Sequence, residues 1–211
     1  MIPHLKTKPL STENLNKGET VYGEELFYSK KSEWRTWNPK RSKLGAALLK
    51  KMTPHITDSS LILYLGASSG TTCSHLSDIV RKGMIFGVEF APRMAREFVL
   101  LSERRPNLTP IVANAAKPEE YRGLVPQVDF LYQDVAQPNQ TDIFLKNADL
   151  FLKKGGQAFL MVKSRSIDVT KNPKEVFKKV ISELSPKLKI LDKRRLEPYE
   201  RDHMAILCKK E

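Results

Sequence analysis

Runs of consecutive apolar residues alternate with stretches of helical periodicity from residue 61 to the end of the chain, which limits the possible folds more than any other feature. The first run, at residues 61–65, is apolar throughout, as a strand covered on both faces should be. The predicted strands occupy residues 61–65, 84–88, 108–112, 128–132, 157–162, 188–191 and 204–208. The spacing of apolar residues predicts helices at residues 71–80, from 92 onward, at 140–152 and from 172 onward. This order predicts an α/β fold with a doubly wound, seven-stranded sheet of Rossmann type.

No helix separates the last two predicted strands, at residues 188–191 and 204–208. Two strands with a short connection pair antiparallel, whereas parallel strands need a long crossover. We therefore expect a mixed sheet with an antiparallel last strand at one edge.

The first 37 residues differ from the rest and predict a small N-terminal β-rich subdomain at 1–37, followed by the main domain at 38–211. Residues 20–28 have the pattern of two short strands about a Gly-Glu turn. A helix is expected to begin at Asn38 and Pro39, which suit its N-cap and first position.

The chain carries a large excess of positive charge. Lys and Arg number 36 and Asp and Glu number 24, which gives a net charge of +12. Basic pairs recur along the whole length of the chain rather than in one tail. The electrostatic field of such a protein attracts polyanions such as nucleic acids. Membrane binding would need an amphipathic basic helix with bulky apolar anchors, and the sequence shows no convincing one.

The sequence shows no targeting or membrane-spanning pattern. Its first residues lack an apolar h-region, and no apolar run is long enough to cross a bilayer. The two cysteines, Cys73 and Cys208, form no CxxC pair, so we interpret them as reduced core thiols and expect no metal site. These features predict a cytoplasmic protein.

A loop of small residues, Gly66-Ala67-Ser68-Ser69-Gly70, joins the first buried strand to the following helix. Such a loop lets a ligand approach the backbone at a helix N-terminus. It lacks the full GxGxxG of a dinucleotide site, but it matches the GxSxG elbow of α/β-hydrolases, with Ser68 as nucleophile and Asp134 and His203 following in the required order. An S-adenosylmethionine loop and a tight turn without ligand are the other readings.

Glu89 and Phe90 favour a nucleoside-containing ligand over the hydrolase. Glu89 ends the second predicted strand, where an acidic side chain can bind ribose hydroxyls. Phe90 adds an aromatic ring suited to the face of a base. A hydrolase needs no acid at this position and would not account for the basic charge.

Four polar residues are expected at the edge of the sheet where open α/β folds carry their chemistry. Asp134 follows the fourth predicted strand and Lys163 the fifth, while Lys43 precedes the first strand and His203 precedes the last. A lysine beside a carboxylate can orient a hydroxyl group and accept or relay its proton.

Five segments of the chain resemble the fibrillarin family: residues 21–24, 37–44, 63–72, 134–138 and 196–203. The runs Asp-Val-Ala-Gln-Pro and Glu-Pro-Tyr-Glu-Arg-Asp-His are specific to that family, and the likeness extends from about residue 20 to the end. The resemblance implies a Rossmann-like class I methyltransferase that uses S-adenosylmethionine to methylate ribose 2′-oxygens of rRNA or tRNA. It also implies a box C/D guide RNA, a Nop-type scaffold protein and a kink-turn-binding ribosomal-type protein as partners.

The resemblance implies site residues as well. The catalytic set would be Lys43, Asp134, Lys163 and His203. The cofactor would contact Gly66, Ala67, Thr71, Thr72, Glu89, Phe90, Asn114, Ala115, Asp134, Val135, Ala136 and Gln137. Asn114 departs from the acid of many relatives, so an amide oxygen would meet the adenine amino group. The alternatives are a non-catalytic, cofactor-binding structural subunit of a ribonucleoprotein and the Ser68 hydrolase.

Overall fold

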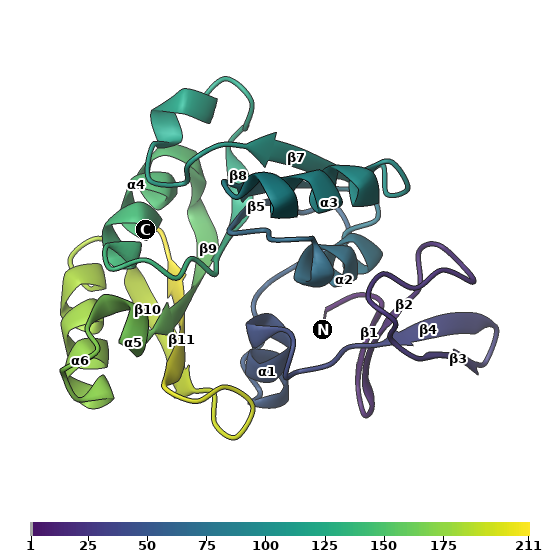
Figure 1. Cartoon of the computed structure of the whole chain (residues 1–211), viewed down its shortest axis with the longest axis horizontal. Helices are drawn as coiled ribbons and strands as arrows, with labels where there is room; N and C mark the ends of the chain where they lie inside the picture. Colours follow the sequence, from purple (N-terminus) through teal and green to yellow (C-terminus); the bar gives the residue numbers. More distant parts are fainter. Residues whose placement is uncertain (1) are drawn as a thin grey trace.

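The computed structural model describes residues 2–211, which form two β-sheets with helices packed between and around them (Figure 1). The larger sheet has seven strands in the order β10-β11-β9-β8-β5-β6-β7. Its strands are β5 (Leu61–Leu65), β6 (Met84–Glu89), β7 (Leu108–Val112), β8 (Val128–Gln133), β9 (Leu152–Lys163), β10 (Lys189–Arg195) and β11 (His203–Lys209). Strand β11 pairs antiparallel with β9 and β10, and the remaining pairs are parallel. The predicted mixed, doubly wound sheet is confirmed.

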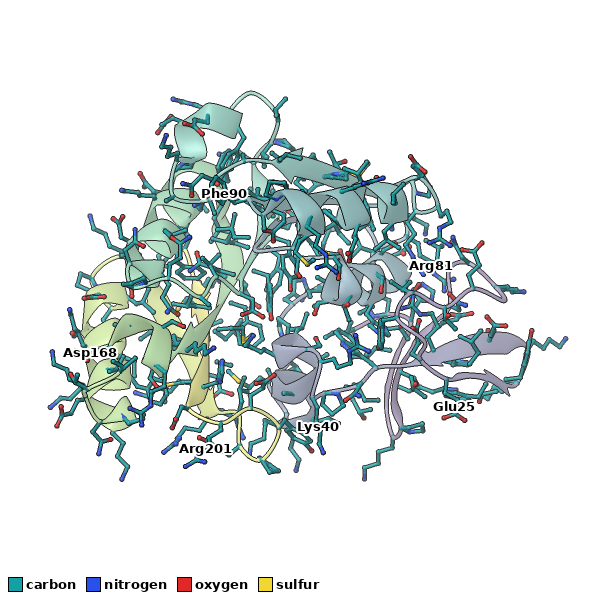
Figure 2. The ribbon with its side chains drawn as sticks, viewed as in Figure 1. Glu25, Lys40, Arg81, Phe90, Asp168 and Arg201 are labelled. Carbon is teal, nitrogen blue, oxygen red and sulfur yellow. The ribbon has the colours of Figure 1, made fainter. Side chains whose placement is uncertain are left out.

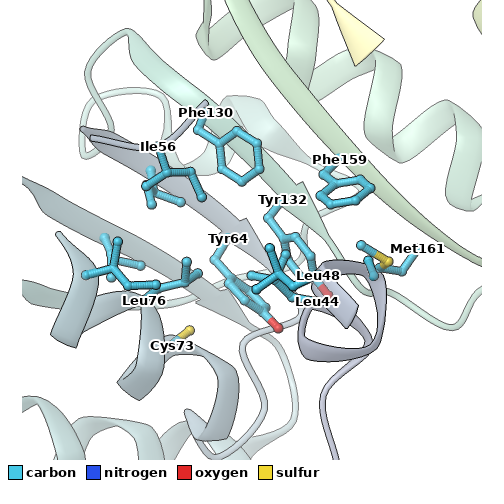
Figure 3. Packing of buried hydrophobic residues seen from close by; sticks show 14 of the residues in the cluster. Leu44, Leu48, Ile56, Tyr64, Cys73, Leu76, Phe130, Tyr132, Phe159 and Met161 are labelled. Carbon is cyan, nitrogen blue, oxygen red and sulfur yellow. The ribbon is translucent and has the colours of Figure 1, made fainter. Parts of the chain in front are cut away.

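Helices cover both faces of this sheet because each strand alternates its side chains between the two sides. Ile62 and Tyr64 of β5 belong to one apolar cluster, and Leu63 and Leu65 to the other. The first cluster lies under α1 (Lys43–Leu49), α2 (Thr71–Ile79) and α3 (Pro92–Ser102), and Figure 3 shows Leu44 and Leu48 of α1 packed beside Tyr64 and Tyr132. The second lies under α4 (Gln140–Phe151) and α6 (Pro173–Leu184). A 3₁₀ turn, η1 (Pro118–Tyr121), and a short helix, α5 (Ser164–Ile167), complete the main domain.

The smaller sheet has four antiparallel strands in the order β1-β2-β4-β3, with bounds β1 (Leu5–Thr7), β2 (Leu10–Glu13), β3 (Leu26–Ser29) and β4 (Ser32–Thr36). A β-rich N-terminal unit is therefore present. Of the two short strands predicted at residues 20–28, the second is present within β3, whereas the first is wrong. The Glu24 carboxylate accepts hydrogen bonds from the backbone of Val21 and Tyr22, which turns this segment into a loop. The division of the chain at residue 37 stays a prediction.

The first helix of the main domain begins later than expected. Asn38 uses its side-chain oxygen to accept from the backbone N–H of Lys40, so it closes a local turn and caps no helix. Ser42 is the N-cap of α1 and accepts from the backbone N–H of Gly45 at 3.2 Å. As a result Lys43 is the first helical residue.

Buried charges join the N-terminal sheet to α2. Asp78 of α2 accepts from the guanidinium of Arg105 at 2.8 Å and from the hydroxyl of Thr12 at 2.6 Å. Arg35 of β4 lies 3.5 Å from Asp78 and 2.7 Å from Glu24. Because Arg35 and Asp78 are fully buried, each charge depends on its partners for stabilisation.

His75 of α2 also lies at the contact between the N-terminal sheet and α2. The ring of Trp37 stacks on its imidazole, with 4.6 Å between the ring centroids. Its Nδ1 lies 2.7 Å from the Thr12 hydroxyl, and its Nε2 lies 2.7 Å from the Tyr22 hydroxyl. Burial, followed by the positive charges of Arg35 and Arg105, holds the pKa of His75 well below its usual value. The folded protein therefore keeps this imidazole neutral.

We expect the protein to lose stability as the pH falls below about 6.5, where the unfolded chain protonates His75 and the folded chain does not. The unfolded state then binds more protons, so the free energy of unfolding rises with pH, by at most about 1.4 kcal/mol per pH unit for one such group. Urea denaturation from pH 5 to pH 8 measures this slope. His75→Asn should have a shallower slope, and equal slopes would contradict the assignment.

None of the helices within residues 2–211 combines the length and the apolar character needed to span a membrane. In the same residues no group of three or more His, Cys, Asp or Glu side chains is arranged to hold a metal ion. Cys73 and Cys208 are both buried as free thiols.

Candidate functional site

A cavity of about 260 Å³ opens where β5, β6 and β8 end, at the point where the strand order reverses direction along the sheet. Ligands of open α/β sheets bind at this kind of switch point. The cavity is lined by Gly66, Ser68, Val88, Glu89, Phe90, Ala91, Ala113, Asn114, Ala115, Asp134, Val135, Ala136 and Gln137.

Gly66 lets the loop after β5 pass close to the loop after β8. Its φ of +82° is a conformation that L side chains rarely adopt, and a Cβ there would lie 2.6 Å from the carbonyl oxygen of Asp134. The backbone N–H of Asp134 donates to the carbonyl of Leu65 at 3.0 Å. The two loops therefore form one continuous wall of the cavity.

Glu89 holds the opposite wall. Its carboxylate accepts from the backbone N–H of Ser68 at 2.7 Å and from that of Ala91 at 2.8 Å. These bonds fix an acidic side chain at the cavity surface and connect it to the glycine-rich loop. A fixed carboxylate of this kind is suited to accept hydrogen bonds from a vicinal diol.

The predicted cofactor residues divide into two groups. Those that line the cavity are Gly66, Glu89, Phe90, Asn114, Ala115, Asp134, Val135, Ala136 and Gln137. Ala67, Thr71 and Thr72 are not part of its lining. The Ala67 N–H donates to the carbonyl of Val88, and the Thr72 hydroxyl donates to Ser42 at 3.0 Å. Their role as ligand contacts stays a prediction.

Phe90 and Asn114 lie on the cavity wall formed by the ends of β6 and β7. The side chain of Phe90, labelled in Figure 2, is 65% exposed. The side-chain oxygen of Asn114 accepts from the backbone N–H of Ala116 at 2.9 Å. Because that oxygen already closes a turn, the expected contact of the Asn114 oxygen with an adenine amino group would have to use its second lone pair.

The four predicted catalytic residues form two pairs at the end of the sheet that carries the cavity. The ammonium of Lys43 lies 2.9 Å from each carboxylate oxygen of Asp134, a contact between residues 91 positions apart. Lys163 and His203 lie directly opposite each other on β9 and β11, so their side chains share a face of the sheet. Lys163 is exposed, and within residues 2–211 its ammonium has no ion-pair partner.

His203 is 6% exposed and presents one nitrogen without a partner. Its Nδ1 lies 2.7 Å from the carbonyl oxygen of Arg201, and a carbonyl can only accept, so Nδ1 carries the hydrogen. Burial lowers the pKa of His203, and the charge of Lys43 lowers it further. The free Nε2 is therefore a buried lone-pair nitrogen close to the Lys43–Asp134 pair.

This arrangement does not support the hydrolase alternative. Asp134 pairs with Lys43, and the Nδ1 of His203 faces a carbonyl group, so these two residues do not form an Asp-His pair. Within residues 2–211 no hydrogen bond joins Ser68 to an imidazole.

Sequence reasoning missed several lining residues: Ser68 in its structural role, Val88, Ala91 and Ala113. Val88 and Ala113 could have been predicted, because each lies at or just beyond the carboxyl end of a predicted strand. The role of Ser68 depends on where its backbone N–H points, which the sequence does not encode in any local pattern.

The Fibrillarin family model matches residues 2–211. A fibrillarin-like rRNA/tRNA 2′-O-methyltransferase from Methanosarcina barkeri is 50% identical over 206 residues, which cover 96% of this chain and 91% of that protein. A fibrillarin crystallised in complex with Nop5p has a TM-score of 0.90 and 42% identity, covering 96% of this chain and 94% of the other. Aeropyrum pernix fibrillarin, crystallised with natively bound S-adenosyl-L-methionine, has a TM-score of 0.86 and 47% identity, covering 94% of this chain and 88% of the other.

Proposed function

The chain belongs to the fibrillarin family, and on that basis we propose that it transfers a methyl group from S-adenosylmethionine to a ribose 2′-hydroxyl of rRNA or tRNA. One observation supports this most strongly. Asp134 lines the cavity that contains the fixed Glu89 carboxylate, and it also forms the ion pair with Lys43. The site for the methyl donor therefore adjoins the residues proposed to act on the ribose hydroxyl.

The lining residues fit S-adenosylmethionine. Glu89 would accept from the ribose hydroxyls of the adenosine, and Phe90 would pack on the adenine, with Ala113 and Ala115 forming an apolar wall. The residues after β8, from Asp134 to Gln137, would hold the remainder of the ligand. When bound, the sulfonium supplies an electrophilic methyl group whose leaving group is neutral.

The residues beside the cavity have to align and deprotonate a weak nucleophile. Lys43 keeps the Asp134 carboxylate in one orientation through contacts to both of its oxygens. Lys163 presents an unpaired ammonium that can hold the 2′-oxygen. Asp134 or the free Nε2 of His203 can receive the proton, because both are acceptors at the same end of the sheet.

Its partners follow from the family membership. A Nop-type scaffold is supported by the related fibrillarin that was crystallised with Nop5p. A box C/D guide RNA and a kink-turn-binding protein would complete a cytoplasmic particle in which the guide selects the nucleotide. The net charge of +12 suits contact with the RNA backbone.

Methyl transfer in a reconstituted particle tests this function. The protein, a Nop-type scaffold, a kink-turn protein, a guide RNA and a target RNA are incubated with methyl-labelled S-adenosylmethionine. We expect label at the one nucleotide that the guide selects, and none when that nucleotide is replaced by its 2′-deoxy counterpart. Label that persists on the 2′-deoxy target, or that appears on a base, would contradict 2′-O-methylation.

Replacing Glu89 with glutamine is expected to weaken S-adenosylmethionine binding by about 10- to 100-fold, because charge-assisted hydrogen bonds to the ribose and to the Ser68 N–H are lost. Calorimetric titration measures the dissociation constant. Glu97→Gln is the matched control, since Glu97 is an exposed residue of α3 that lies outside the cavity lining. Equal affinity of Glu89→Gln and the parent protein would remove Glu89 from the ligand site.

A further inference from the structure

Gln140, the first residue of α4, lies between the two halves of the site. It is 0% exposed, although glutamine is mostly a surface residue. A buried amide has to find partners for its oxygen and its nitrogen, and both partners of Gln140 belong to segments that carry proposed site residues.

On one side Gln140 contacts the loop that follows β8. Its Nε2 donates to the carbonyl of Gln137 at 3.1 Å, and its backbone N–H donates to the same carbonyl at 3.2 Å. Gln133, the last residue of β8, donates through its own amide to the carbonyl of Gln140 at 2.7 Å. These bonds brace the loop between Gln133 and Gln140, which holds Asp134 and the lining residues 135–137.

On the other side Gln140 contacts the end of β9. Its Oε1 accepts from the backbone N–H of Lys163 at 3.3 Å, and its Nε2 lies 3.4 Å from the carbonyl of Lys163. The next residue, Ser164, is held from the opposite direction, where its backbone N–H and its hydroxyl both donate to the carbonyl of Asp202 at 3.1 Å. The backbone of Lys163 is therefore fixed between α4 and the segment that precedes β11.

We propose that Gln140 is a positioning residue for methyl transfer, which couples the loop carrying Asp134 to the backbone of Lys163. This rests on the proposed function of the site. Gln140 lies outside the cavity lining and acts through other residues: its side-chain amide sets the distance between the Asp134 carboxylate and the Lys163 ammonium. Effects of this kind are large, because a displacement of about 1 Å in a catalytic group can cost about 100-fold in rate.

A purely structural role is the competing explanation, and Asn107 separates the two. Asn107 is a buried amide with the same pattern of bonds, since it donates to the carbonyls of Ser77 and Val80 and accepts from the Ser77 hydroxyl. It precedes β7, at the end of the sheet away from the cavity. Loss of either amide should reduce stability, but only Gln140 should affect catalysis.

The test compares Gln140→Leu and Asn107→Leu with the parent protein in the reconstituted particle. For Gln140→Leu we expect kcat to fall about 10- to 100-fold, with the S-adenosylmethionine dissociation constant within about threefold of the parent value. Hydrogen exchange of the Lys163 amide should also become faster, because its acceptor is gone. Asn107→Leu should keep the parent kcat and the parent exchange rate at Lys163.

Gln140→Glu gives a second readout that does not require the leucine variant to fold. Its carboxyl group keeps an acceptor for the Lys163 N–H, but in the ionised form it can no longer donate to the carbonyls of Gln137 and Lys163. The ratio of its kcat to that of the parent should therefore rise as the pH falls and the carboxyl group protonates.

A parent-like kcat in Gln140→Leu, or an equal loss in Asn107→Leu, would overturn the positioning role. So would a Gln140→Glu ratio that does not change with pH. If the parent protein itself transfers no methyl group in the complete particle, the proposed function fails instead, and the exchange rate at Lys163 still reports on the contact.

Discussion

Lys163→Met is expected to lower kcat for methyl transfer by about 10²- to 10⁴-fold, the usual contribution of one group that positions or transfers a proton. The side chain is exposed at the end of β9, and within residues 2–211 its ammonium has no ion-pair partner, so its loss should leave the free energy of unfolding unchanged. The residue also lies outside the cavity lining, and S-adenosylmethionine should bind as before. Single-turnover kinetics in the reconstituted particle measures the chemical step.

Lys154→Met is the matched control for this prediction. Lys154 is an exposed lysine of the same strand, at its other end, so both variants lose one positive charge and weaken general attraction to RNA to a similar extent. A parent-like kcat in Lys163→Met would remove Lys163 from the catalytic residues. Normal assembly with a lost kcat would exclude the alternative of a non-catalytic, structural subunit of a ribonucleoprotein.

Asp78→Ala is expected to destabilise the protein by about 3–5 kcal/mol, because removal of one member of a buried charge network leaves its partners uncompensated. Arg105 would lose its 2.8 Å contact with Asp78, and Arg35 would lose one of its two carboxylate partners and keep Glu24 and its hydrogen bond to the Ser74 hydroxyl. Chemical denaturation measures the change. Asp142→Ala is the control, since Asp142 pairs with Lys146 at a site where both side chains are about half exposed, and it should change the unfolding free energy by less than about 0.5 kcal/mol.

Equal changes in the free energy of unfolding for Asp78→Ala and Asp142→Ala would mean that the buried charges stabilise the protein no more than an exposed ion pair does. The Asp78→Ala variant also tests how strongly the N-terminal sheet depends on the main domain, across the predicted boundary at residue 37. Arg35 and Thr12 belong to the N-terminal sheet and Asp78 to α2, so Asp78→Ala measures how much this contact between the sheet and the main domain stabilises the protein.

The sequence predicted the large sheet well because its central strands are buried on both faces and are therefore rich in apolar residues, as in β5 with its run Leu61–Leu65. The small sheet was harder to predict. Strands β1 and β2 are only three and four residues long, and they mix polar with apolar residues. The loop at residues 21–24 exists because Glu24 pairs with Arg35, and no local pattern reveals that contact.

The position of the site was predictable from the order of the strands. Asp134 follows β8 and Lys163 ends the neighbouring parallel strand β9, so their position at the same edge of the sheet follows from the fold. The salt bridge between Lys43 and Asp134 depends on where α1 begins, and the expected start at Asn38 was wrong. Gln140 carried no signal, since a glutamine at the start of a helix is usually a surface residue.

The central claim is that the cavity beside Asp134 binds S-adenosylmethionine, and calorimetric titration of the purified protein tests it most directly. NAD is titrated in parallel, because it shares the adenosine moiety. We predict saturable binding of S-adenosylmethionine at one site per chain and no binding of NAD at the same concentrations. Absence of S-adenosylmethionine binding at millimolar ligand, both for the protein alone and with a Nop-type scaffold present, would contradict the account.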